Sequence, residues 1–502
     1  MLLPLPHVSP ERLETGQRAL VRDLAWASLS GSFAGGVILV AFALALGATP
    51  VQVGLLAAIP FLAQAAQLPA TVLIEKLMQR KRVAVVAITA ARVVVLLMAV
   101  LPFMASPGVA LAGLLGAQVL ISLLGAVGAC AVNSWLHQLI PPHQFGNFFA
   151  RRLLAGTLVA CAGTLAAGLL VDQGVRLDRL MQAYSVAFVL AALAGFASSG
   201  YLARAPEPQM LAAGPAVRIS ERLMAPFGDR NFRRLLLFLG AWAMASNLAA
   251  PFIAVYLIEQ RQYPVGLVTA LWVGSQLANA LTLYLWGRLS QRLSNKAVLA
   301  VVLPVHFASI LGLVFIDVVS DPGAQLALLA AIHLVLGVAT GGIGLALGNL
   351  GLKLAPQGQG TAYLASIGLV SAVAGGLAPI AAGALAQALQ AFEVSAVLRW
   401  FGSRGAGERS LLTFAHWEFL FAMSALAGLY VMHALSRIDE GREVSERRVV
   451  QEFALEAWRS VNSVTSIGGA LGNLFPFERL TERRRWWSRH ADDRTRWQEV
   501  HP

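Results

Sequence analysis

Long apolar runs and short polar interruptions alternate along this chain from residue 24 to residue 436. Twelve of the runs are each long enough to form the ~20-residue helix that crosses a bilayer. We expect membrane helices at 24–46, 53–74, 83–103, 109–139, 153–171, 181–202, 235–258, 265–286, 297–317, 324–349, 362–390 and 414–436. The pattern therefore predicts an all-α membrane protein.

The composition agrees with that prediction. The 502 residues are 57% hydrophobic and 13% charged, whereas soluble domains carry roughly 25% charged residues. The two cysteines, Cys130 and Cys161, both fall in apolar runs, so we expect neither a disulfide framework nor a zinc site. They are interpreted as buried small apolar residues.

The cations are divided unevenly between the two ends of the expected helices. Most of the 38 Lys and Arg lie in the N-terminal segment, in the loops that follow even-numbered helices and in the C-terminal tail. The opposite loops hold Arg176, Arg179, Arg261, Arg399, Arg404 and Arg409. Because Lys- and Arg-rich loops stay in the cytoplasm, both termini are predicted to be cytoplasmic. The net charge of +12 is explained by topology, and we expect no nucleic-acid partner.

Several landmarks of the first half recur about 215 residues later. Ala25-Trp26-Ala27 matches Ala241-Trp242-Ala243, and the basic segment at 71–82 matches the basic segment at 287–296. A repeat of this length is too long for a solenoid. It fits two parallel six-helix halves of a transporter.

The two basic segments resemble the loops between helices 2 and 3 and between helices 8 and 9 of the major facilitator superfamily. The family form is Gly-x-x-x-Asp-Arg-x-Gly-Arg-Lys. The later segment keeps Gly287, Arg292 and Lys296 but has Gln291 in place of the Asp and Ser294 in place of the second Gly. The earlier segment carries its acid at Glu75.

This resemblance implies twelve helices in two pseudo-symmetric six-helix bundles. The expected divisions are an N-terminal bundle at 1–203, a cytoplasmic linker at 204–234, a C-terminal bundle at 235–436 and a cytoplasmic tail at 437–502. In the tail, Val449, Phe453 and Ala457 have the spacing of a short amphipathic helix on the inner leaflet; a partly ordered tail is the alternative.

In the family, the acid and the Arg of these loops hold the two halves together at the cytoplasmic face. By resemblance the gating residues here are Glu75, Lys76, Arg80, Gly287, Gln291, Arg292 and Lys296. The alternative is that these residues only set the topology, and Gln291 lacks the charge for an ion pair.

The resemblance also implies a central cavity lined by helices 1, 4, 7 and 10, with helices 2, 5, 8 and 11 where the halves meet. The candidate substrate-binding residues on those helices are Ser28, Gln64, Gln67, Gln118, Asn133, Trp242, Asn247, Tyr256, Gln276, Asn279, His333 and Asn349. Amide and aromatic groups of this kind suit an uncharged or amphipathic solute. Each of them singly can instead form an interhelical hydrogen bond.

Two titratable groups within the spans have open roles. Arg92 lies in mid-span, where a charge is costly; it either binds an anionic substrate or packs internally. No Asp or Glu lies in the middle of a predicted span. His333 is therefore the candidate for proton coupling, and facilitated or otherwise coupled transport is the alternative.

These observations predict a secondary-active or facilitative transporter of a small neutral or amphipathic solute, acting as a monomer in the inner cell membrane. A flippase for lipids or amphiphiles, and a receptor or scaffold that has lost transport, remain alternatives. An enzyme is not expected, because no nucleophile, metal cluster or carboxylate pair occurs at a meaningful spacing. No cofactor or metal is expected either.

Overall fold

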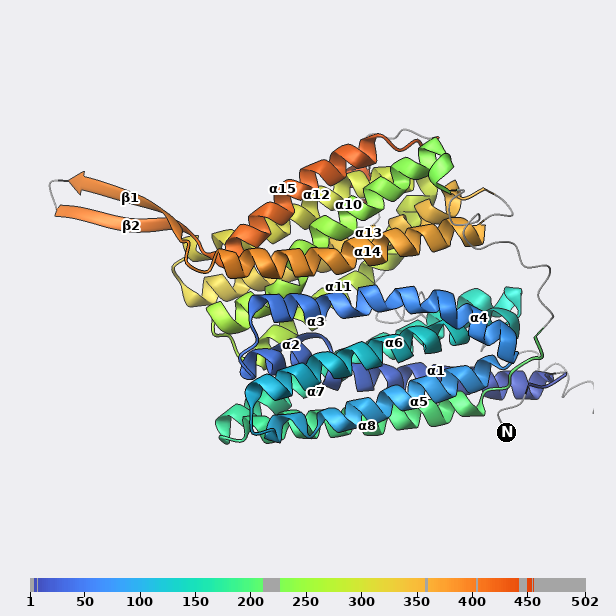
Figure 1. The fold of residues 1–502 in the computed structure, drawn as a ribbon. Coiled ribbons are helices and arrows are strands. Elements are labelled where there is room, and N and C mark those ends of the chain that lie inside the picture. The colour runs from blue at the N-terminus through green and yellow to red at the C-terminus, as the bar shows by residue number, and fades with distance from the viewer. Residues whose placement is uncertain are drawn as a thin grey trace, which may run out of the picture.

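The computed structural model describes residues 4–6, 8–210, 226–356, 360–402, 405–441, 449–453 and 455. Within those residues, twelve helices are long and apolar enough to cross a membrane. They form two bundles that lie side by side along their length (Figure 1). The predicted fold class, twelve helices in two halves, is confirmed.

The N-terminal half contains six spans, two of which are interrupted. Its helices are α1 (Pro10–Ala34), α2 (Gly36–Ala45), α3 (Pro50–Leu62), α4 (Gln67–Leu77), α5 (Arg80–Met98), α6 (Pro107–Leu139), α7 (Phe145–Arg176) and α8 (Leu180–Arg204). Short 3-10 turns lie at Ala63–Ala66, Leu101–Phe103 and Pro142–Gln144. The first span breaks between α1 and α2 because Gly36 adopts a φ of 52°, which glycine tolerates without strain.

The C-terminal half repeats this plan. Its helices are α10 (Arg230–Val255), α11 (Val265–Arg292), α12 (Asn295–Gly312), α13 (Pro322–Leu354), α14 (Gly360–Ala388) and α15 (His416–Ser436). A π-helical turn at Tyr256–Gln260 extends α10, and a 3-10 turn at Leu313–Val318 extends α12.

A β-hairpin that the hydropathy pattern did not predict joins α14 to α15. β1 (Val394–Gly402) pairs antiparallel with β2 (Gly405–Phe414), and the register places Arg399 opposite Glu408. The hairpin projects beyond one end of the helices, and the N-terminus lies at the other end (Figure 1). We call these two ends the hairpin face and the terminal face.

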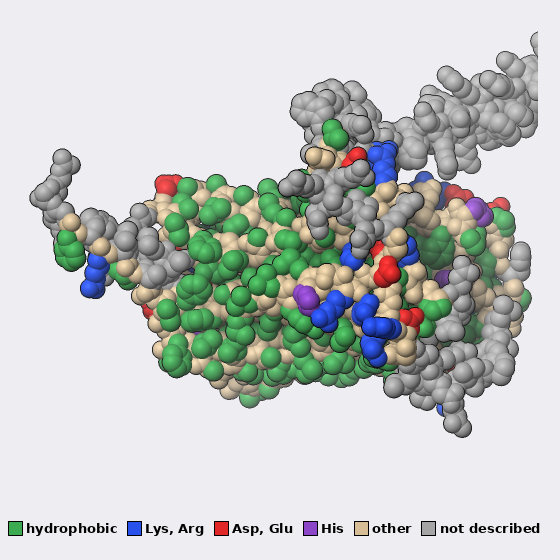
Figure 2. Space-filling view, turned by 90° about the horizontal axis from the view of Figure 1, so that it is seen from above, with side chains coloured by type: hydrophobic (Ala, Val, Ile, Leu, Met, Phe, Trp, Pro, Cys, Tyr) green, Lys and Arg blue, Asp and Glu red, His purple; other side chains and the backbone are tan. Residues whose placement is uncertain are grey.

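The surface of the bundles has the polarity of a membrane protein. Figure 2 shows apolar side chains over most of the helical surface, with Lys and Arg gathered toward the terminal face. Leu97, Leu169, Leu193 and Leu281 are each at least 59% exposed. Apolar side chains that face outward along spans of this length are expected to contact lipid.

Two segments outside the spans pack onto the bundles at the terminal face. Residues 205–210 follow α8 and pair with Leu5 at Pro208. In the tail, residues 449–453 are helical; Val449 is buried and Phe453 stacks on Trp286 with ring centroids 4.6 Å apart. Ala457, the third position of the expected tail helix, lies outside the described residues.

Candidate functional site

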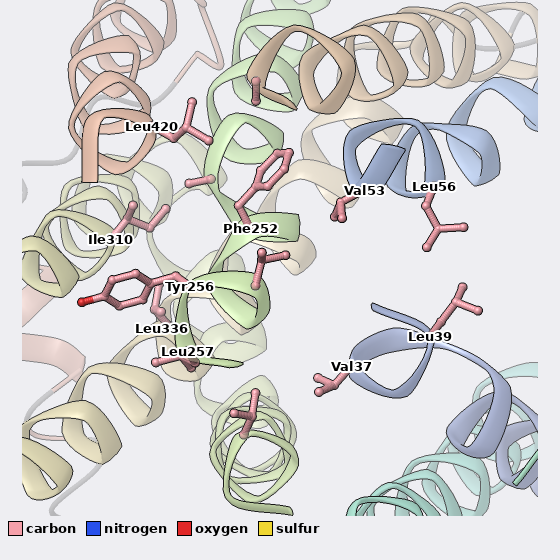
Figure 3. Packing of buried hydrophobic residues seen from close by; sticks show 14 of the residues in the cluster. Val37, Leu39, Val53, Leu56, Phe252, Tyr256, Leu257, Ile310, Leu336 and Leu420 are labelled. Atoms are coloured by element: carbon pink, nitrogen blue, oxygen red, sulfur yellow. The ribbon is translucent and has the colours of Figure 1, made fainter. Parts of the chain in front are cut away.

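A cavity of about 580 Å³ lies between the two halves at mid-depth. Its N-terminal wall comes from α1, α2, α3, α5 and α6, and its C-terminal wall comes from α10, α11, α12 and α13. Figure 3 shows Leu39 and Leu56 pointing toward each other on the N-terminal side, across from Leu257 and Leu336. The volume lies within the 300–1,000 Å³ range of sites for small organic ligands.

The wall of the cavity is apolar with a few convergent polar groups. Four residues predicted from the sequence line it: Gln118, Gln276, His333 and Arg92. Ser30, Trp272, Ser275, His306 and Thr340 also line it. Among the described lining residues, Arg92 carries the permanent charge and none is Asp or Glu.

The two histidines of the cavity have different surroundings. The Nδ1 atom of His333 lies 2.9 Å from the carbonyl oxygen of Leu329, one turn earlier on α13. Neither ring nitrogen of His306 has a hydrogen-bond partner among the described residues. The ring of His306 packs edge-on against Trp242, with centroids 5.0 Å apart. Trp242 therefore supports the cavity wall from behind.

The other predicted substrate-binding residues lie outside this lining. Asn247 donates to the carbonyl of Ala243, Tyr256 is 1% exposed and donates to that of Leu313, and Gln67 bonds with Gln64. Ser28 faces Gly156 of α7, and Asn279 faces Gly341 of α13, where each side chain fills an interhelical contact. Asn133 is exposed on α6, and Asn349 donates to Ser290 near the terminal face.

On the hairpin side of the cavity, glycines allow the backbones of the two halves to come into close contact, and these contacts close the cavity on that side. A Cβ atom added at Gly54 of α3 would lie 2.3 Å from the carbonyl oxygen of Pro379 in α14. One added at Gly383 of α14 would lie 2.4 Å from the carbonyl oxygen of Pro50. We call Gly54, Gly383 and the α7–α11 pair Gly168 and Gly266 the glycine seam. Only residues without a side chain permit this approach.

Asp172 bonds across the glycine seam. Both carboxylate oxygens of Asp172, near the end of α7, lie 3.1 Å from the backbone N–H of Gly266 in the first turn of α11. This hydrogen bond joins the N-terminal half to the C-terminal half. A carboxylate at a helix N-terminus interacts favourably with the free N–H groups and the helix dipole.

The N-terminal half carries a buried ion pair at the terminal face, which we call the N-terminal network. Glu207, just after α8, accepts a hydrogen bond of 2.7 Å from the backbone N–H of Arg80, at the start of α5. The Nε atom of Arg80 lies 3.6 Å from the same carboxylate, and both side chains are at most 4% exposed. Burial raises the pKa of Glu207. Arg80 also donates to the carbonyls of Ser134 and Pro208, so it joins α5, α6 and the segment 205–210.

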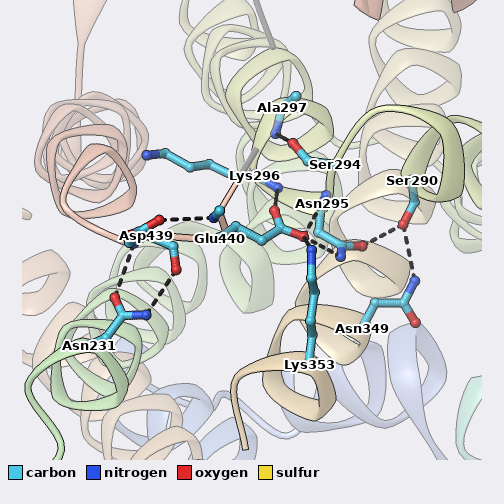
Figure 4. A network of polar contacts seen from close by, with 11 residues as sticks. Asn231, Ser290, Ser294, Asn295, Lys296, Ala297, Asn349, Lys353, Asp439 and Glu440 are labelled. Atoms are coloured by element: carbon cyan, nitrogen blue, oxygen red, sulfur yellow. Dashed lines mark hydrogen bonds and ion pairs between the residues drawn. The ribbon is translucent and has the colours of Figure 1, made fainter. Parts of the chain in front are cut away.

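An equivalent C-terminal network surrounds Glu440, just after α15 (Figure 4). Its carboxylate accepts from the backbone N–H of Lys296 at 2.6 Å, from the side chain of Asn295 at 2.8 Å and from Lys353 at 3.1 Å. Burial opposes ionisation, but these hydrogen bonds outweigh it and lower the pKa of Glu440. Glu207 and Glu440 therefore bind the first turns of α5 and α12, the equivalent helices of the two halves.

The lowered pKa of Glu440 predicts a pH-dependent effect of Glu440→Gln. Hydrogen bonds to a charged group contribute about 1.5–3 kcal/mol, so the variant should be less stable by that amount at neutral pH. The contribution of Glu440 is present above its unfolded pKa of about 4.3 and is lost as pH falls through the lower folded value. Thermal unfolding in detergent should therefore show the two proteins converging on acidification. A constant gap from pH 7 downward would contradict the network.

The remaining gating residues differ in how far they are exposed. Lys296 donates through Nζ to the carbonyls of Ser436 and Ile438, within the C-terminal network. Glu75, Lys76 and Gln291 are exposed at the terminal face. Arg292 is exposed at the end of α11, and a Cβ at Gly287 would meet no atom closer than 3.8 Å.

Ser294 explains one departure from the family form. Its hydroxyl accepts from the backbone N–H of Ala297, so it caps the N-terminus of α12. The corresponding position of the first half, Met78, has a left-handed φ of 52° and ends α4. A side chain that caps the next helix thus replaces glycine in the second half.

Comparisons with solved structures show the same fold at low sequence identity. A bacterial homologue of the lysosomal transporter Spinster, in an inward-facing conformation, has a TM-score of 0.60 at 16% identity, covering 87% of this chain and 100% of that one. A bacterial homologue of the iron transporter ferroportin, also inward-facing, has a TM-score of 0.60 at 14% identity, covering 86% and 99%. A mutant of the nucleoside transporter NupG has a TM-score of 0.59 at 12% identity, covering 86% and 100%.

Sequence comparison identifies the family. No curated protein sequence matches the chain. The family model described as Major Facilitator Superfamily matches residues 24–379, which include most of the first span, the second to tenth spans and most of the eleventh. Together with the twelve membrane-length helices in two bundles, this match shows that the chain is a multi-pass membrane protein belonging to the major facilitator superfamily of transporters.

Proposed function

We propose that this protein is a secondary-active or facilitative transporter that moves a small neutral or amphipathic solute by alternating access. The observation that carries the proposal is the cavity between the halves, with the glycine seam and Asp172 on its hairpin side. Toward the terminal face, α4 packs on α6 of its own half. A site that is sealed from one side can release a solute to the other, and a reversible seal would let it alternate.

The proposed orientation places the terminal face in the cytoplasm of an inner cell membrane. Lys and Arg gather at that face, and cations of this kind mark cytoplasmic loops (Figure 2). The conformation then corresponds to the inward-facing state that is named for the Spinster and ferroportin homologues. We propose that the monomer is the transporting unit.

Exchange in proteoliposomes tests this proposal. Vesicles that contain the purified protein are loaded with a mixture of unlabelled metabolites, and uptake of each labelled metabolite is followed with and without a proton gradient. Alternating access predicts at least one solute whose uptake saturates and is stimulated by the same solute inside. Uptake that rises linearly with concentration, or that equals uptake into protein-free vesicles, would contradict the proposal.

The carboxylates of Asp172 and Glu75 should bias the transporter in opposite directions. Asp172→Asn weakens the bond across the hairpin side, and a charge–dipole contact of this kind is worth about 0.3–2 kcal/mol. The state open at the hairpin face should gain roughly twofold to thirtyfold in population.

Glu75→Gln should favour the state open at the terminal face, because the acid at this position of the family loop stabilises closure of that face. The transport rate should fall far more than the substrate affinity.

Cysteine labelling measures this bias. Val40→Cys, in a background without Cys130 and Cys161, places one thiol in the cavity wall. An impermeant thiol reagent added at the hairpin face should react faster in Asp172→Asn and more slowly in Glu75→Gln. Equal labelling rates in all three backgrounds would remove both carboxylates from the gate.

A further inference from the structure

Arg92 provides a permanent positive charge in the wall of the cavity. It is the thirteenth residue of α5 and lies about 18 Å along the helix axis from Arg80, at a rise of 1.5 Å per residue. That position is near the middle of a membrane-spanning helix, where an ionised side chain is costly unless it has a partner or faces a water-filled cavity. The charge of Arg92 must therefore be stabilised by an internal counter-ion, by a ligand or by water in the cavity.

The neighbouring helices leave room for the side chain of Arg92 but do not neutralise it. A Cβ at Gly195 of α8 would lie 2.3 Å from Cδ of Arg92, so this glycine makes space for the side chain. The Nη1 atom donates to the hydroxyl of Ser30 on α1 at 3.2 Å, and the buried Nε atom has no acceptor among the described residues. A neutral hydroxyl satisfies one of five N–H groups and supplies no countercharge.

Asp23 interacts electrostatically with Arg92, but its carboxylate is hydrogen-bonded to other side chains. One oxygen of its carboxylate accepts from Ser198 at 2.7 Å, and the other accepts from Arg152 at 3.4 Å. Arg92 forms no ion pair with it among the described contacts. The N-terminal half thus places two partly buried arginines, Arg92 and Arg152, around the buried Asp23. Of these two arginines, only Arg92 lines the cavity.

The opposite wall adds groups that can receive a polar ligand. Neither ring nitrogen of His306 has a partner in the described part of the chain, and Gln276 presents an amide to the same cavity. Most of the remaining wall, including Leu56, Ile121 and Ile310, is apolar. The site therefore has one cationic anchor, a few neutral hydrogen-bonding groups and an extended apolar surface.

From this arrangement we infer that the transported solute is an amphipathic organic anion whose single acidic group, a carboxylate or a phosphate, binds the guanidinium of Arg92. A carboxylate or phosphate can accept two parallel hydrogen bonds from arginine and supply the missing countercharge. The apolar body of the solute would lie on the aliphatic side chains. This inference rests on the proposed transport function and narrows its substrate class to anions.

A matched set of octyl compounds tests the charge preference. Octanoate, octyl phosphate, octanamide and octylammonium have the same apolar chain and differ in the head group. Calorimetric titration of the purified protein should show at least one anion binding about tenfold or more tighter than the amide, with the ammonium weakest. The ratio of octanoate to octyl phosphate affinity identifies which acid the site prefers.

Variants of Arg92 and a surface arginine serve as controls. Arg92→Gln should reduce the preference for anion over amide to about twofold or less, and Arg92→Lys should retain part of it because the charge remains. Arg18→Gln removes an exposed arginine that pairs with Glu14 and should leave the preference unchanged. Equal binding of anion and amide by the wild type, failure of both anions to bind, or a preference that persists in Arg92→Gln would overturn the inference.

A second measurement tests the electrostatic potential of the cavity without a ligand. Gln118→Cys, in a background without Cys130 and Cys161, should react faster with an anionic than with a cationic methanethiosulfonate, relative to an exposed cysteine at Leu77. Arg92→Gln should remove this difference. If the reaction rates do not depend on Arg92, the cavity is not anion-selective.

Saturable anion binding without any vesicle transport would contradict the proposed function alone, whereas transport that does not depend on the charge of the solute would contradict only this inference.

Discussion

Replacing Gly54 with alanine is expected to hold the hairpin face open and to reduce transport. The added methyl group would lie 2.3 Å from the carbonyl oxygen of Pro379, which belongs to a helix backbone and cannot rotate away. Overpacking of this kind costs about 1–3 kcal/mol, so the state closed at the hairpin face should lose roughly fivefold to 150-fold in population. Turnover in vesicles should fall by at least about fivefold, because each cycle passes through that state.

A second glycine provides the control for helix propensity. Gly125→Ala adds the same methyl group to α6, where no atom lies within 4 Å. This variant should keep wild-type turnover, and both variants should be produced and purified in similar amounts. Normal turnover in Gly54→Ala would show that the glycine seam does not have to close during transport.

Glu207→Ala is expected to have the largest effect on stability. The substitution removes the acceptor of the Arg80 backbone N–H and leaves the Arg80 guanidinium buried without its carboxylate. Removing one partner of a buried ion pair costs about 3–5 kcal/mol. The thermal unfolding midpoint of the purified protein should fall, and less folded protein should be recovered from the membrane.

Glu207→Gln separates the hydrogen bond from the charge. The amide oxygen can still accept from the backbone of α5, so this variant should be more stable than Glu207→Ala. Because burial raises the pKa of Glu207, the loss of its charge costs less than it does at Glu440. An unchanged midpoint in Glu207→Ala would contradict a structural role for the N-terminal network.

The number and order of the helices follow from the sequence because each span is fixed by local apolar length. Polar extensions carry no such signal: α1 begins at Pro10, although the apolar run begins at residue 24. The side chain of Ser9 caps that helix, and the Ser-Pro pair is the local signal that marks this start. The β-hairpin formed by Val394–Gly402 and Gly405–Phe414 lies between two expected spans and carries scattered charges, so the hydropathy pattern gives no signal for it.

The site could be predicted only in part, because helical periodicity does not give the rotation of each helix about its axis. Gln118, Gln276 and His333 face the cavity, whereas Asn247 on the expected lining helix α10 bonds to its own backbone. His306 reaches the cavity from α12, which the family arrangement does not count among the lining helices. Glu207 and Glu440 bind partners 127 and 145 residues away, so only the tertiary structure reveals their role.

Distance measurements between spin labels test alternating access most directly. One pair, at Val175 and Glu259, spans the halves in a recess at the hairpin face; the other, at Leu77 and Gln291, spans them at the terminal face. Relative to the wild type, Gly54→Ala should lengthen the first distance and shorten the second. If both distances stay unchanged, or if both lengthen together, the two halves do not move reciprocally and the alternating-access account is wrong.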